Sequence, residues 1–165
     1  MKKWLVLLMV VMMVMSAVGC GASSANDSVL KLEEDNGILT CLDTETSPLD
    51  GGLLITVDKE NKTVNMQITD AEGNPTVEFY NFNVEENICH RYKYVSMMGT
   101  GFNYMYDYNK EELVQILDND DVDKTQSTKD SGRFDGAQSE TKENVDALKA
   151  YFETAFGMKI EDSIL

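Results

Sequence analysis

The sequence predicts an α+β fold, in which an antiparallel meander sheet of about six or seven strands carries a C-terminal helix on one face. Two observations predict it. Short segments rich in alternating apolar residues follow one another between residues 29 and 108, separated by tight-turn sequences and without a helical period. Beyond residue 139, apolar residues recur at helical spacing. Short connections join antiparallel strands, so we expect the strands to pair in chain order.

The first predicted hairpin joins residues 29–34 to residues 38–42. Asn36 and Gly37 separate these segments, and Asn-Gly is typical of a two-residue hairpin turn because both residues tolerate positive φ. Five more strands are expected where β-branched and aromatic residues concentrate or alternate with polar ones. These strands are residues 53–58, 63–70, 76–84, 88–97 and 102–108.

The remaining third of the chain changes character. Asn109 followed by Glu112 is typical of a helix start, and Leu113, Ile116 and Leu117 would then share one face of a short helix. Residues 118–138 are polar and acidic, which predicts a mobile loop. The C-terminal helix follows, with Gly157 placed to end it. Its apolar stripe consists of Val145, Leu148, Phe152, Ala155 and Phe156.

The first 20 residues carry a targeting pattern. Lys2 and Lys3 precede an unbroken apolar run over residues 4–15, which is too short to span a bilayer as a helix. The run continues into residues 15–20, which read Met-Ser-Ala-Val-Gly-Cys. This stretch resembles the lipobox of bacterial lipoprotein precursors, although Ala17 stands where that family favours Leu, Val or Ile.

The resemblance implies a lipid anchor. Residues 1–19 would be removed as a signal peptide, and Cys20 would be lipidated and become the mature N-terminus. Residues 20–28 would form a flexible tether, and residues 29–165 a single globular domain. The protein would then be anchored in the cell membrane and face outside the cytoplasm. An ordinary secretory signal is the alternative interpretation of the same residues.

The charge of the chain excludes one class of partner. The formal net charge is −15, and the signal peptide contains two lysines but no acid, so the mature chain is more acidic still. Such a charge repels phosphate backbones, which excludes nucleic acid as a partner. We interpret the acidity as a means of keeping the protein soluble, and not as a specific attraction for cations.

Three cysteines are present, and lipidation would consume Cys20. Cys41 and Cys89 remain, an even pair in an exported chain, and we expect a disulfide between them. Two buried thiols are the alternative. The wide spacing lacks the Cys-x-x-Cys pattern of redox and zinc sites.

An aromatic series is the main candidate for recognition. It could pack under the C-terminal helix, or it could present a platform for a protein, a peptide or a sugar. We expect Tyr92 and Tyr94 to be buried, and Tyr104, Tyr106 and Tyr108 to be partly exposed as the recognition surface. The full even-numbered series is Tyr92, Tyr94, Met98, Phe102, Tyr104, Tyr106 and Tyr108.

Other motifs give little support for catalysis. The acidic run at residues 118–123 fails the EF-hand pattern because Lys124 stands where the tight turn requires Gly. His90 is the only histidine, and we find no phosphate loop or nucleophile motif. We therefore expect no metal or cofactor and a non-enzymatic binding or interaction domain. A small cell-envelope hydrolase that uses acidic residues, or a purely structural envelope protein, is the alternative.

The lipid anchor is directly testable. Replacing Cys20 with Ala should leave an uncleaved precursor that incorporates no labelled fatty acid, because the thiol is the acceptor of the lipid. Metabolic labelling of producing cells measures this. Absence of label from the wild-type protein would contradict the anchor.

Overall fold

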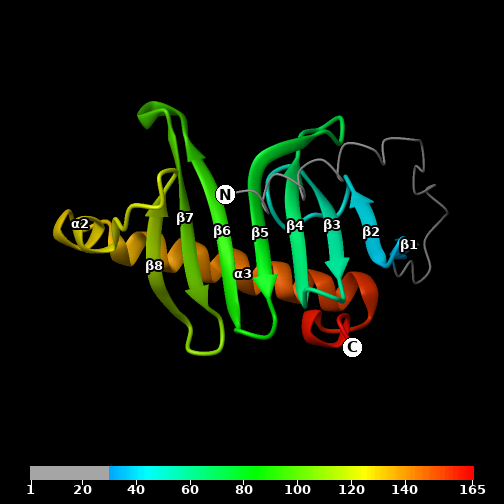
Figure 1. The fold of residues 1–165 in the computed structure, drawn as a ribbon. Coiled ribbons are helices and arrows are strands. Elements are labelled where there is room, and N and C mark those ends of the chain that lie inside the picture. Colours follow the sequence, from blue (N-terminus) through cyan, green and yellow to red (C-terminus); the bar gives the residue numbers. More distant parts are fainter. Residues whose placement is uncertain (1–29) are drawn as a thin grey trace.

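The computed structural model describes residues 30–165. The lipobox, Cys20, the tether and Val29 lie outside the described residues. The strands form one eight-stranded antiparallel sheet in the order β1-β2-β3-β4-β5-β6-β7-β8, and a long helix near the C-terminus packs against it (Figure 1). The predicted α+β meander is confirmed, with eight strands instead of six or seven.

From β2 to β7 the strands follow the predicted segments closely, whereas β1 covers residues 33–35 where residues 29–34 were predicted. They are β1 (Glu33–Asp35), β2 (Ile38–Asp43), β3 (Gly52–Asp58), β4 (Thr63–Thr69), β5 (Pro75–Asn83), β6 (Ile88–Val95), β7 (Thr100–Asp107) and β8 (Glu112–Asp118). The helices are α2 (Thr125–Asp130) and α3 (Phe134–Phe156), with short 3₁₀ turns at η1 (Ser96–Met98) and η2 (Ile160–Asp162).

Turn chemistry sets the strand register. Asn36 and Gly37 adopt φ of 52° and 83°, as the hairpin prediction requires. At the same end of the sheet, three four-residue turns share another pattern of hydrogen bonds and backbone conformation. Each begins after a side chain that accepts backbone N–H groups of the turn, and each ends in a residue with positive φ. The accepting residues are Asp58, Asn83 and Asp107, and the closing residues are Lys62, Asn87 and Glu111.

Residues 112–118 form strand β8, so the predicted helix there is wrong. The Asp107 carboxylate accepts the N–H groups of Asn109 and Lys110, which makes a hairpin turn instead of a helix start. Between neighbouring pairs of the β7–β8 ladder, β8 advances two residues and β7 only one, which leaves Val114 as a β-bulge. The bulge brings Leu113 and Ile116 to the same face at a spacing of three, which imitates a helical period.

Residues 118–138 also depart from the prediction of a loop, since they contain α2 and the first turn of α3. Their polar side chains satisfy local backbone groups. The Asp118 carboxylate accepts the N–H groups of Asp120 and Val122, each at 3.0 Å. The Thr125 hydroxyl accepts the Ile116 N–H at 2.9 Å and so ties this segment to β8. A polar composition therefore accompanies regular structure here.

One face of the sheet is buried by α3. The alternation of strand residues places Cys41, Ile55, Met66, Tyr80, Arg91, Tyr104 and Ile116 in one row across the sheet. The apolar stripe of α3 shares the core with this row, and Val145, Leu148 and Phe152 have no exposed area. Gly157 ends the helix in the left-handed conformation at φ 68°. The predicted helical stripe and its end are confirmed.

Side-chain hydrogen bonds show how α3 crosses the strands (Figure 1). Four positions along the helix bond, in order, to β8, β6, β5 and β2, so that its N-terminal end lies by β8 and its C-terminal end by β2. The bonded pairs are Gln138 with Leu113, Thr141 with Arg91, Asn144 with Tyr80, and Tyr151 with Asp43. The helix is thus held at both ends of its path.

Arg91 is the charged residue at the centre of this interface. Its guanidinium lies 5.7 Å from the ring centre of Tyr80 and 5.5 Å from that of Tyr104. It also donates to Thr141 at 3.0 Å and pairs with Glu140 at 2.5 Å. Burial alone would raise the pKa of Glu140, but hydrogen bonds from Lys93 and Arg91 outweigh burial and lower it. The buried charge is therefore compensated.

The expected disulfide between Cys41 and Cys89 is not formed. Both residues are buried, on β2 and β6, and no bond joins them. Three strands separate β2 from β6. At about 4.8 Å per strand spacing, the two backbones lie about 19 Å apart along the sheet. A disulfide needs Cα atoms within about 7 Å. The even count of cysteines was therefore a poor guide to their pairing.

Residues 158–165 form a docked tail. Ile160 and Ile164 are buried, and Lys62 and Lys59 donate to the carbonyl groups of Ile164 and Leu165 at 3.1 Å and 3.0 Å. Among residues 30–165, no helix is long and apolar enough to span a membrane.

Asp43 anchors the C-terminal half of α3. Its carboxylate accepts two backbone N–H groups, the Thr46 hydroxyl and the Tyr151 hydroxyl, the last at 2.5 Å. Burial would raise the pKa of Asp43, but the hydrogen bonds from Thr46 and Tyr151 outweigh burial and hold it below 3.8. Asp43 is thus a buried anion fully occupied in linking β2 to α3.

We predict that Tyr151→Phe costs about 1.5–3 kcal/mol of unfolding free energy, because a hydrogen bond to a charged group is lost. Tyr80→Phe is the matched control, since Tyr80 bonds the neutral Asn144, and should cost about 0.5–1.5 kcal/mol. Urea denaturation at a series of pH values measures both.

The pH dependence separates the two variants. A carboxyl with a lowered pKa in the folded state stabilises above its unfolded pKa and loses that contribution as the pH falls through the folded pKa. The difference between wild type and Tyr151→Phe should therefore shrink below pH 3.8, and that of Tyr80→Phe should not. Equal costs and equal pH profiles would contradict the anchor.

Candidate functional site

The three tyrosines expected as a recognition surface lie on the face that α3 covers. Tyr106 is 1% exposed and belongs to the core, which corrects the prediction that it is partly exposed. Tyr104 and Tyr108 are half-buried and pack against the core. Lys149 covers the Tyr108 ring at 4.4 Å.

The strand register explains this outcome. Arg91 pairs with Tyr104, so even-numbered residues of β6 share a face with odd-numbered residues of β7. Tyr92 and Tyr94 therefore point away from α3, and Tyr94 is 42% exposed. The expectation that both are buried is wrong for Tyr94, and Tyr92 is only half-buried.

We call the sheet face opposite α3 the open face. Two rows of residues cross it, both read directly from the strand pairing. The first row is Thr40, Thr56, Asn65, Asn81, His90, Met105 and Gln115. The second row is Leu42, Leu54, Gln67, Phe79, Tyr92, Asn103 and Leu117.

From β2 to β8, neither row contains an acidic or basic side chain. On the edge strand β1, Glu33 pairs with Thr40 and extends the first row by one carboxylate. Such a scarcity of charge is unusual for a chain with 29 acidic residues and a net charge of −15. Solvated sheet faces normally carry charged residues, which keep the surface soluble and prevent association. The open face instead presents amides, hydroxyls and aromatic rings, a composition typical of binding surfaces.

An aromatic pair marks the centre of the second row. Phe79 and Tyr92 face each other on neighbouring strands, with ring centres 5.5 Å apart and ring planes 11° apart. The Tyr92 hydroxyl donates to Asn119 at 3.0 Å. The same hydroxyl lies over Gly101, where a Cβ would come within 2.1 Å of it. Glycine at this position leaves the space in which the tyrosine ring lies.

Three polar side chains adjoin the aromatic pair. His90 lies opposite Asn81 in the ladder, and its Nδ1 is 3.4 Å from the Asn103 side-chain nitrogen. The side-chain oxygens of Asn81 and Asn103 are buried and accept no hydrogen bond from the described residues. Each such oxygen costs about 1–3 kcal/mol of stability. Two such oxygens beside one histidine indicate that these side chains serve a role other than stabilising the fold.

The protonation of His90 is coupled to this environment. Burial lowers the pKa of His90 below its ordinary 6.5, and the nearby Glu86 charge and the Asn103 contact oppose the shift only in part. The ring is consequently neutral at pH 7, with one donor and one acceptor nitrogen. The whole cluster is therefore uncharged.

Exposed apolar residues border this cluster at the β6–β7 end of the sheet. Met97, in η1 between β6 and β7, is 98% exposed. Met98, Tyr94 and Val77 are 56%, 42% and 60% exposed. Val77 lies two residues from Phe79 on β5, and Tyr94 lies two residues from Tyr92 on β6, so both side chains point to the open face. They extend its apolar part.

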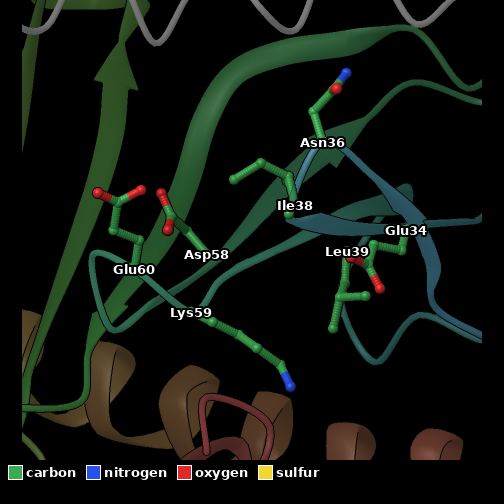
Figure 2. A pocket seen from close by; sticks show the side chains of 8 residues that line it. Glu34, Asn36, Ile38, Leu39, Asp58, Lys59 and Glu60 are labelled. Carbon is green, nitrogen blue, oxygen red and sulfur yellow. The ribbon is translucent and has the colours of Figure 1, made fainter.

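A cavity of about 380 Å³ lies elsewhere, beside the β1–β2 hairpin and the β3–β4 turn (Figure 2). Figure 2 shows Asp58 and Glu60 pointing to one side and Lys59 to the other. Asp58 accepts hydrogen bonds from Asn61 and caps its turn, and Lys59 reaches the C-terminal residue Leu165. Asp58 and Lys59 therefore already serve structural roles at this cavity.

The second cavity, of about 530 Å³, lies between the end of α3 and η2. Two of its charged lining residues, Lys149 and Glu161, form an ion pair at 2.7 Å. In the acidic run at 118–123, Asp118 pairs with Lys124 at 3.0 Å. Within residues 30–165, no three His, Cys, Asp or Glu side chains gather as a metal site would require.

Sequence reasoning missed Phe79, Asn81 and Asn103 as members of a site, and treated His90 as a surface or sheet histidine. Each lies on a correctly predicted strand, so the alternation that places them on one face was available. The missing information was the register across the β6–β7 hairpin. No family model, curated protein or solved structure matches this chain.

We predict that His90 titrates with a pKa below 6.5. It is the only histidine, so its ring proton resonance in an NMR titration is unambiguous. Because the unfolded state binds the proton more tightly, stability should fall as the pH drops from 7 through the folded pKa. His90→Gln should flatten that part of the stability profile. A pKa at or above 6.5 would contradict the burial of a neutral ring.

Proposed function

We propose that the protein is a lipid-anchored extracytoplasmic lipoprotein whose domain binds a ligand or partner, without catalysis, through the open face. The lipobox-like residues 15–20 support the anchor on Cys20 and the location at the cell membrane. Residues 21–29 then connect Cys20 to Leu30, and extended they would reach at most about 36 Å. The domain would work close to the membrane surface.

One observation carries the binding part of the proposal. An acidic protein keeps two rows of one sheet face free of charge from β2 to β8, and there it places a stacked aromatic pair beside two amide oxygens without partners. Aromatic rings and adaptable amides are the side chains that binding surfaces use for contact area and for hydrogen bonds. The covered face of the sheet carries the stability of the fold, so the open face is available for recognition.

The chemistry of the open face supports binding more than hydrolysis. General acid–base catalysis by carboxylates needs two such groups on either side of the substrate. From β2 to β8 the two open-face rows carry neither Asp nor Glu, and the groups beside His90 in these rows are amides and aromatic rings. Such groups hold and orient a ligand, whereas proton transfer needs an ionisable partner.

Photo-crosslinking in producing cells tests this proposal. Benzoylphenylalanine replaces Tyr92 on the open face, and in a matched control it replaces Asn109 in the exposed β7–β8 turn. The reactive ketone inserts into C–H bonds of proteins, peptides and glycans alike. We expect a specific adduct from position 92 and none from position 109.

Two results would contradict the proposal. Position 92 could give no adduct although the variant is folded and membrane-bound, or both positions could give the same adducts. Membrane fractionation of the same cells reports the anchor separately, so loss of the anchor is not confused with loss of binding.

A further inference from the structure

We infer that the open face binds a chain of neutral sugar rings, with Phe79 and Tyr92 as the stacking platform and Asn81, His90 and Asn103 as hydrogen-bonding groups. This inference rests on the proposed function, in which the open face is the binding site, and it specifies the chemical class of the ligand.

The charge of the open face favours a neutral ligand. The open face is neutral within a strongly acidic protein, so an anionic ligand would meet the repulsion of the surrounding carboxylates without a basic group to offset it. A basic ligand would find no carboxylate in either row from β2 to β8, and three strands separate Glu33, on β1, from the aromatic pair. The adjacent row contains four carboxylates, of Asp35, Asp58, Asp107 and Glu112. Turn residues donate hydrogen bonds to the first three, and Glu112 lies on the edge strand β8. A neutral ligand avoids both penalties.

The side chains of the open face match the chemistry of a sugar ring. A sugar ring has an apolar face of C–H groups and a rim of hydroxyls that both donate and accept. Parallel aromatic rings can stack on the apolar face of the sugar. Side-chain amides can bond its hydroxyls because each amide offers two donors and an acceptor. The side-chain oxygens of Asn81 and Asn103 accept no hydrogen bond from the described residues, and a hydroxyl donor would supply one.

The distances across the sheet allow one ligand to contact all of these groups. Asn103 faces Tyr92 directly in the same row, about 5 Å away. Asn81 and His90 occupy the neighbouring row, two residues along each strand, or about 7 Å. A ligand stacked on the aromatic pair could therefore reach all three polar groups without leaving the surface.

An extended peptide is the competing ligand, and the sheet edges disfavour it. Peptides commonly bind by adding a strand to an exposed edge. The edge strand β1 has three residues, and all of them are acidic: Glu33, Glu34 and Asp35. The other edge, on β8, is bridged at Leu117 by Asp123. Charged and covered edges resist strand addition.

The test uses the lipidated protein in detergent micelles, labelled for NMR. It is titrated with tetramers of mannose, glucose and N-acetylglucosamine. A mannuronic acid tetramer is the matched control, since it differs from the mannose tetramer by its carboxylates. A neutral alanine-rich peptide represents the competing class. The readout is the side-chain amide resonances of Asn81 and Asn103, with Gln126 on α2 as an internal reference.

We expect at least one neutral tetramer to shift the Asn81 and Asn103 resonances in a saturable manner and to leave Gln126 unchanged. Tyr92→Leu should weaken that binding about tenfold through loss of ring stacking. The isosteric Asn103→Asp should weaken it as well, and Tyr108→Phe on the opposite face should not. Urea denaturation of each variant verifies folding.

Absence of a shift with every neutral tetramer would overturn the inference, as would an equal response to mannuronic acid. A saturable shift with the peptide alone would assign the face to peptides. If the crosslink at position 92 persists in either case, the open face remains a binding site and only the ligand class is wrong. If that crosslink is absent too, the proposed function fails with it.

Discussion

The packing of a single amphipathic helix on a wide sheet is the interaction on which the rest of this structure depends. The stripe of α3 and the inward residues of the strands form one core, in which Ile55, Phe82 and Leu148 are fully buried. Hydrogen bonds at Arg91 and Asp43 fix the helix at two points of its path across the strands. Because α3 covers only one face, the composition of the other face is free of the demands of this core.

That freedom is visible in the residues of the open face. The covered face buries apolar side chains and pairs the buried charge of Arg91, as stability requires, although the buried Tyr106 hydroxyl there also has no hydrogen-bond partner among the described residues. The open face keeps two amide oxygens without partners, and it buries part of a histidine in its neutral form. Both features lower stability, and both concentrate around one aromatic pair. Natural proteins accept such local costs mainly where they act.

Much of the fold was predictable because the relevant signals are local. Asn36-Gly37 predicted the first hairpin, and the helical spacing from Val145 to Phe156 predicted α3 and its end at Gly157. The strand β8 was not predictable from spacing, since the bulge at Val114 gives Leu113 and Ile116 a helical interval. The Cys41–Cys89 disulfide was expected from a count of residues, which contains no information on the three strands between them. The site depended on register: one residue in the β6–β7 hairpin decides whether Tyr92 or Tyr104 faces α3.

Oxidative footprinting in intact producing cells shows whether the open face is the occupied surface of the protein. Hydroxyl radicals modify accessible aromatic and sulfur side chains, and Phe79, Tyr92 and Met105 report the open face. Met158, which is 38% exposed beyond the end of α3, serves as the reference. The account predicts that the three open-face residues are oxidised in the purified protein and protected in cells, while Met158 is oxidised equally in both. Equal oxidation of Phe79, Tyr92 and Met105 in cells and in the purified protein would contradict it.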